Sequence, residues 1–185
     1  MKWIMKSSSI QDYLSESKWI DFSHPKIQIA AQGLAERALK SLSIQDEGFY
    51  QDPEIAVAKA CYHFVRDEIH HSFDVSAKDV TIRASDVLEK GHGLCYAKSH
   101  LLAALLRANG IPAAICYQYL RMDENVNTSL IVHALNAICP EYLGTWIRLD
   151  ARGNTNGIDA QFFVDKEQIA FSVDPGKGET DLPFL

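Results

Sequence analysis

The spacing of hydrophobic residues changes near the middle of the chain. In the first half, apolar side chains recur at the intervals of one helix face, and in the second half they form short runs that favour strands. The helical stretches are residues 27–39, 53–69 and 95–109. The strand-like runs are residues 111–120, 130–138 and 145–150. The pattern therefore predicts helices first and a sheet afterwards.

Capping signals mark the ends of two of these helices. Residues 52–54 read Asp-Pro-Glu, which supplies a cap, a proline in the first turn and an acid near the positive end of the helix dipole. We expect this helix to run over residues 53–69. His70 and His71 follow it, where a cation suits the helix dipole. Gly110 stands where a left-handed cap would end the later helix.

The remaining segments show weaker signals. Residues 1–52 are expected to form a helical N-terminal extension, and residues 72–83 a surface loop that leads to a helical turn at 84–89. Residues 169–173 are expected to form one more strand. The Gly- and Pro-rich stretch 174–178 is expected to be loosely held.

Helices followed by strands predict the α+β class. Short loops join the strand-like runs, which favours an antiparallel meander. We therefore expect the helices, including the N-terminal lobe, to pack on one side of an antiparallel sheet. The length of 185 residues fits one domain, and we expect residues 1–185 to form one.

Composition and charge exclude several classes of partner. A net charge of −6 without a cluster of lysines and arginines argues against nucleic acid. We find no apolar run long enough for a membrane span or a signal peptide. The cysteines at positions 61, 95, 116 and 139 lack the spacing of metal ligands. We expect reduced thiols in a cytoplasmic protein, with neither a metal nor a cofactor.

Cys95 is the first candidate for chemistry. Gly91 and Gly93 precede it and the leucine-rich helix follows it, so the thiol lies where a glycine loop meets a helix N-terminus. Unpaired backbone N–H groups and the helix dipole favour a thiolate there, and the thiolate is the nucleophile. The alternative is a small buried cysteine at the start of a core helix.

His133 and Asp150 are candidate partners of this thiol. A cysteine nucleophile needs a base, for which histidine suits neutral pH, and a third group that fixes the imidazole tautomer. His133 lies within an apolar strand, and Asp150 ends the next one, where an unpaired carboxylate would be costly. On adjacent antiparallel strands the two can stand side by side.

Other interpretations of these residues remain open at this point. His133 can be a core histidine whose nitrogens are bonded to backbone. The three residues Cys95, His133 and Asp150 are also possible zinc ligands by type, although a fourth ligand of recognisable spacing is missing. A binding or scaffold module that keeps the fold without catalysis is a further alternative, although such a module would be expected to have lost a member of this set.

The chain also resembles a known family, the transglutaminase-like superfamily. The motifs that carry the resemblance are ASDVL at 84–88, GHGLC at 91–95, LLRANGIPA at 105–113, His133, Trp146 and Leu149-Asp150. The resemblance is strongest over residues 53–151. It implies a papain-like α+β fold, the transglutaminase core, with Cys95 as nucleophile, His133 as general base and acid, and Asp150 as the orienting carboxylate.

The resemblance also implies a reaction class, with two departures. Members transfer acyl groups through a thioester, so we expect a peptide or protein amide substrate, with a protease or deamidase favoured over a cross-linking enzyme. Leu135 stands where relatives often carry an aromatic residue. Two groups are candidates for assisting the oxyanion, the backbone N–H of Cys95 and the side chain of His71.

Overall fold

The computed structural model describes residues 7, 9–42, 48–121 and 129–183. Its α-helices are α1 (Pro25–Ser41), α2 (Pro53–His63), α3 (Ala84–Lys90) and α4 (Cys95–Ala108). Its strands are β1 (His70–His71), β2 (His92–Gly93), β3 (Ala113–Arg121), β4 (Leu130–Ile138), β5 (Ile147–Leu149) and β6 (Thr180–Asp181). Short helical turns of other types are η1 (Ile10–Leu14), η2 (Gly48–Gln51), η3 (Phe64–Glu68) and η4 (Pro175–Lys177).

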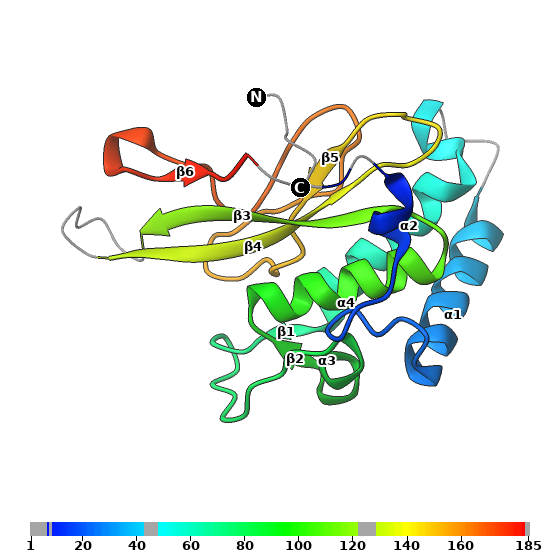
Figure 1. The fold of residues 1–185 in the computed structure, drawn as a ribbon, viewed down its shortest axis with the longest axis horizontal. Helices are drawn as coiled ribbons and strands as arrows, with labels where there is room; N and C mark the ends of the chain where they lie inside the picture. The colour runs from blue at the N-terminus through cyan, green and yellow to red at the C-terminus, as the bar shows by residue number, and fades with distance from the viewer. Residues whose placement is uncertain (1–6, 8, 43–47, 122–128, 184–185) are drawn as a thin grey trace.

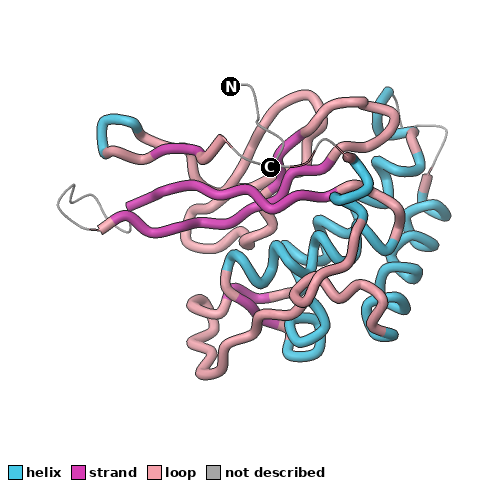
Figure 2. The backbone as a smooth tube through the Cα atoms, viewed as in Figure 1, coloured by secondary structure: helices cyan, strands magenta, loops and turns pink. Residues whose placement is uncertain are grey.

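The larger sheet confirms the predicted antiparallel meander. Its strands lie in the order β5-β4-β3-β6, and β3 pairs with β4 from Ala113 opposite Ile138 to Arg121 opposite Leu130. β5 pairs with β4 only over residues 136–138, so residues 130–135 of β4 have no β5 partner. Figure 2 shows this sheet as one layer with most of the helices gathered below it.

Helix α4 forms the centre of the main core. Its leucines are fully buried, and it packs against β3 and β4 on one side and against α1, α2 and α3 on the others (Figure 1). The opposite face of the sheet carries a smaller apolar cluster, in which Tyr13 packs edge-on against Trp146 at 4.8 Å between ring centroids. The predicted packing of helices on one side is therefore confirmed for α1–α4, whereas η1 lies on the other side.

The helix predicted over residues 53–69 is confirmed as far as Glu68, although its last turn is π-helical. Asp52 caps its start as expected, with Oδ1 accepting from the N–H groups of Glu54 and Ile55 at 2.9 and 3.0 Å. The α-helix ends at His63, however, and a π-helical turn follows over 64–68. This wider turn ends in an extended Ile69, so the chain leaves the helix before the two histidines.

His70 and His71 consequently form a strand and not a helix end. β1 pairs in parallel with β2, with His71 opposite Gly93, and the N–H of Ser72 donates to the carbonyl of Gly93 at 3.0 Å. This pairing brings residues 70–72 beside the loop that leads into α4. A pairing of two-residue strands leaves no periodic signal in the sequence, which explains why the pattern missed it.

Two predictions about the C-terminal segment are wrong. Residues 169–173 form no strand, and the following stretch is held in place. Arg148, a buried guanidinium, forms ion pairs at 2.6 Å with Glu167 and Asp181, one on each side of this stretch. A buried cation needs such partners, so Arg148 fastens β6 to the sheet.

The N-terminal extension contains less helix than predicted. Residues 15–24 have no helical structure. Within this stretch, Asp21 accepts from the N–H and the hydroxyl of Ser85 at 3.1 and 2.6 Å. This segment therefore fixes the first turn of α3 in place.

Among the helices that the structure describes, none is both long and apolar enough to cross a membrane.

Candidate active site

Glycine shapes the approach to Cys95. At Gly93, an added Cβ would lie 3.1 Å from the Cβ of Ala97 and 3.2 Å from the Oγ1 of Thr81, which is tighter than a side chain normally tolerates. Gly91 has a positive φ of 70° and ends α3. The chain can therefore turn from α3 through β2 directly into the first residue of α4, which is Cys95.

The side chain of Cys95 is partly buried and faces two imidazoles. Burial by itself raises the pKa of a thiol, but the side chains of His133 and His71 and the backbone N–H of Ala134 interact with the sulfur and lower the pKa of Cys95 to about 6. At neutral pH this cysteine is therefore mainly a thiolate. The thiol predicted to be activated from its place at a helix N-terminus thus also interacts with two histidines.

His133 and Asp150 form a buried pair. The Nε2 atom of His133 lies 2.8 Å from Oδ2 of Asp150, and the two side chains are 4% and 1% exposed. Burial lowers the pKa of His133, but hydrogen bonding to Asp150 and Cys95 outweighs it and raises this pKa to about 9. The imidazole therefore carries a proton where the cysteine has lost one, and the two groups titrate as a coupled pair.

Backbone groups fix the carboxylate of Asp150. Its Oδ1 accepts from the N–H of Arg152 and its Oδ2 from the N–H of Ala170, both at 3.1 Å. The ring of Phe171 stands edge-on to the imidazole of His133, with 5.1 Å between centroids. Because Nε2 is bound to Asp150, Nδ1 is the ring nitrogen left to serve Cys95. The structure thus brings all three predicted site residues together.

His71 joins this group through β1. Its side chain is 7% exposed, it interacts with Cys95, and its Nδ1 atom has no hydrogen-bond partner. Sequence reasoning placed His71 at a helix end and gave it only a minor role near the oxyanion. The missing signal was the parallel pairing of His71 with Gly93, two residues before Cys95.

Lys98 is a buried residue that sequence reasoning missed. Its side chain is 1% exposed, and its Nζ donates to the carbonyl of Ile69, the residue before β1. An added Cβ on Gly153 would lie 3.6 Å from the same Nζ. Burial and the nearby Arg152 lower the pKa of Lys98 to about 7. The sequence did indicate that Lys98 is buried, because this residue occupies the same helical face as Leu101, Leu102 and Leu105.

A cleft of about 830 Å³ opens at Cys95. Its walls come from four places in the chain: β1 and the following loop, the start of α4, the ends of β3 and β4, and the segments around 152–158 and 170–179. In Figure 1, β1 lies below the start of α4 and β4 lies above it. The cleft therefore gives a substrate access to the sulfur.

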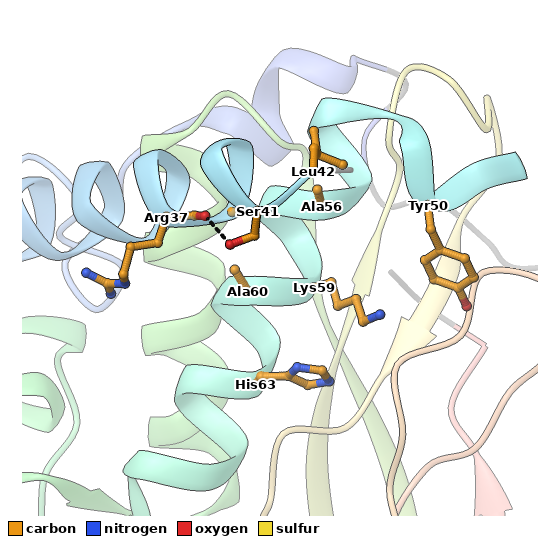
Figure 3. A pocket seen from close by; sticks show the side chains of 9 residues that line it. Arg37, Ser41, Leu42, Tyr50, Ala56, Lys59, Ala60 and His63 are labelled. Carbon is orange, nitrogen blue, oxygen red and sulfur yellow. Dashed lines mark hydrogen bonds between the residues drawn. The ribbon is translucent and has the colours of Figure 1, made fainter. Parts of the chain in front are cut away.

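A smaller hollow of about 320 Å³ lies between α1 and α2. It contains the cationic side chains Arg37 and Lys59 together with His63. Figure 3 shows that these side chains diverge, since Arg37 points away from Lys59, whose Nζ lies 4.8 Å from the ring centroid of Tyr50. They form no convergent site for one ligand.

No group of three or more histidine, cysteine or acidic side chains within the described ranges has an arrangement that would hold a metal ion. The zinc interpretation of Cys95, His133 and Asp150 therefore gains no support from their geometry. Their contacts instead form a chain in which the carboxylate binds the imidazole and the imidazole binds the thiol.

This constellation and fold define a papain-like protein with a cysteine at the start of its central helix. Residues 46–151 match the model of the transglutaminase-like superfamily, and the chain belongs to this superfamily. No curated protein sequence matches the chain.

Solved structures similar to this one include a transglutaminase and a candidate cysteine protease. Red sea bream transglutaminase aligns with a TM-score of 0.54 and 14% identity, over 82% of this chain and 33% of that protein. The periplasmic domain of TgpA from Pseudomonas aeruginosa (0.48, 19%) is matched over 77% of this chain and 46% of that domain. A candidate cysteine protease from Cytophaga hutchinsonii (0.48, 22%) is matched over 79% and 43%. The chain thus spans less than half the length of each of these proteins.

Proposed function

We propose that this protein is a cysteine-dependent enzyme that cleaves or transfers the acyl group of a peptide or glutamine-type amide through a thioester. Cys95 is the nucleophile, His133 the general acid and base, and Asp150 the group that orients the imidazole. The observation that carries the proposal is the contact of Cys95 with the buried His133–Asp150 pair, together with a thiol pKa lowered to about 6.

The reaction follows from the protonation states of the pair. The thiolate of Cys95 attacks the carbonyl carbon, and the imidazolium of His133 gives its proton to the leaving nitrogen as the C–N bond breaks. This leaves a thioester on Cys95 and a neutral imidazole. His133 then takes a proton from water, whose oxygen attacks the thioester, and the acid product leaves with the thiolate and imidazolium restored.

The negative oxygen of the tetrahedral intermediate needs donors. The backbone N–H of Cys95 is one, because the first residue of a helix has no intrahelical partner for its N–H. We assign the second to the side chain of His71, which is buried beside the same sulfur. Donating to this negative oxygen is the role that we assign to the second imidazole of the active site.

Water is the acyl acceptor that we favour. An amine acceptor would be drawn to a carboxylate near the sulfur, but the acids that line the cleft, Asp174 and Glu179, are already bonded to backbone N–H groups of the protein. Protein cross-linking by amine transfer is the alternative. All four cysteines are free thiols, which fits the cytoplasmic location that we propose.

Alkylation by iodoacetamide tests the activated thiol directly. We expect Cys95 to label at neutral pH much faster than Cys139, which is also partly exposed but has a raised pKa. The labelling rate of Cys95 should rise with a midpoint near pH 6. Equal labelling of the two cysteines would refute the activated thiol and leave a non-catalytic binding module as the better description.

The acceptor is tested separately. Trapping the acyl-enzyme from a mixed peptide pool, with mass spectrometry of the Cys95 peptide, identifies the donor. Repeating the reaction with a labelled primary amine then distinguishes the two outcomes, because hydrolysis releases acid whereas transfer incorporates the label. Cys95→Ala is the control, since it must abolish both products.

A further inference from the structure

Apolar side chains gather in the cleft around Cys95 while remaining exposed. On β4, Ile131 and Val132 directly precede His133 and are 39% and 52% exposed. Phe73, which follows β1, is 70% exposed and lines the same cleft. Single exposed apolar residues are common on any protein, but a group of them around a nucleophile marks a binding surface.

The guanidinium of Arg152, which lines the cleft, is already paired within the protein. Arg152 binds Asp74 through both terminal nitrogens, at 2.8 and 3.0 Å, and also binds the hydroxyl of Thr155. The guanidinium of Arg152 is therefore bound to a carboxylate of the protein itself. An anionic substrate group would have to displace Asp74 to reach it.

The acids at the rim are engaged in the same way. Glu179 accepts from the backbone N–H groups of Arg121 and Asp174, at 2.9 and 2.8 Å. Asp174 accepts from the N–H of Gly176 at 2.8 Å, and the Nε of Arg121 donates to the carbonyl of Lys177 at 2.7 Å. These bonds hold the rim in place and give Glu179, Asp174 and Arg121 backbone partners.

We infer that the cleft selects acyl donors whose side chains next to the reacting carbonyl are aliphatic or aromatic. The inference rests on the proposed function, because it assigns the substrate class of the same nucleophile. An apolar side chain laid against Phe73, Ile131 and Val132 removes apolar surface from water on both sides. A charged side chain in the same place loses hydration and meets ionic groups that are already paired.

Four thioesters of N-acetylated amino acids test this preference. They carry the side chains of leucine, phenylalanine, lysine and glutamate on the same leaving thiol, and their kcat/KM values are divided by their rates with free glutathione to remove intrinsic reactivity. The leucine and phenylalanine esters should react at least about tenfold faster than the other two. Equal normalised rates, or faster reaction of a charged ester, would overturn the inference.

A pair of variants connects the preference to the cleft wall. Val132→Glu should lower the rate of the leucine ester and raise that of the lysine ester, because it adds an unpaired carboxylate to the wall of the cleft. Val80→Glu is the matched control, since Val80 is 69% exposed, lies between β1 and α3 and is not among the residues that line the cleft. An equal effect of both variants would contradict a role of this wall.

The alkylation of Cys95 and the Cys95→Ala variant test the proposed function separately from the substrate preference. Rapid alkylation of Cys95 without a preference among the esters removes the substrate class and leaves the activated nucleophile in place. Slow alkylation of Cys95, with ester cleavage that survives in Cys95→Ala, removes the proposed function instead.

Discussion

Cys95 and Cys61 show how differently one fold treats the same side chain. Cys61 lies on α2, which packs against α4, and it is fully buried among apolar residues. Burial raises its pKa to about 12, and the side-chain bond that its sulfur accepts, from Nδ2 of Asn109, is long at 4.0 Å. Cys95 is also largely enclosed, yet its pKa falls to about 6.

The difference teaches that enclosure and activation are separate properties. Removing a thiol from water penalises its charged form in both places. Only around Cys95 do donors outweigh that penalty, because β4 brings His133 and β1 brings His71 to the start of α4. Removing these imidazoles one at a time should therefore convert Cys95 step by step into a residue like Cys61.

His133→Ala should have the largest effect. It removes the acid and base as well as the main donor to Cys95, so kcat/KM for an amide should fall roughly 10³-fold. The pKa of Cys95 should move well above its present value of about 6, because the burial penalty remains. The midpoint of alkylation against pH measures this shift, and an unchanged midpoint would show that His133 does not activate the thiol.

His71→Ala should reduce kcat/KM by about 10²-fold, which is typical for the loss of one oxyanion donor. Part of that loss would come from a less ionised Cys95, so the measurement is repeated at pH 9 with a thioester. A deficit that persists there belongs to the oxyanion, and His71→Gln should recover part of it. His70→Ala, next to it on β1 but exposed, should react like the wild type.

The pH profile sharpens the comparison without a mutation. With an amide donor, kcat/KM should be highest between about pH 6 and 9, since the thiolate forms above the lower value and the imidazolium is lost above the upper one. Outside this window the rate should fall about tenfold per pH unit. A thioester donor should show only the acidic limb, because its leaving thiolate needs no proton. A single limb near pH 9 for both donors would indicate an ordinary thiol.

Part of this site could be predicted from the sequence because its signals are local. Gly91 and Gly93 before Cys95 mark a tight loop, and the apolar runs around His133 and before Asp150 mark neighbouring strands. Two of the elements that complete the site depend on contacts between distant segments. The β1–β2 pairing that brings His71 to Cys95 is too short for any periodic pattern, and the bond from Ala170 to Asp150 joins residues from two irregular stretches.

Residues 169–183 show the same limit of prediction from the local sequence. An apolar run at 169–173 has the composition of a strand, but Phe171 is used against the imidazole of His133 and its carbonyl accepts from Gln118. The tail was expected to be loose because of its glycines and proline. Its hold comes in part from a buried cation, Arg148, whose two acidic partners lie 19 and 33 residues further along the chain, and in part from bonds of Asp174 and Glu179 to backbone N–H groups.

Lys98→Met should have the smallest effect on rate and the clearest effect on stability. Its Nζ ties α4 to Ile69, directly before β1, so its loss should loosen His71 and lower kcat/KM by less than about tenfold. Because the folded pKa of Lys98 lies near 7 and an unfolded lysine titrates about pH 10.4, the unfolded chain binds more protons between these values. Lys98 therefore makes unfolding free energy rise with pH in this range, by at most about 1.4 kcal/mol per pH unit.

Urea unfolding at several pH values between 7 and 10 measures this contribution. Lys98→Met should remove its part of the slope, whereas Lys40→Met, at an exposed position near the end of α1, should keep the slope of the wild type. Equal slopes in all three proteins would mean that Lys98 titrates in the fold as it does in water. Lys98, in the first turn of α4, would then belong to the polar surroundings of Cys95 and not to the apolar core that encloses Cys61.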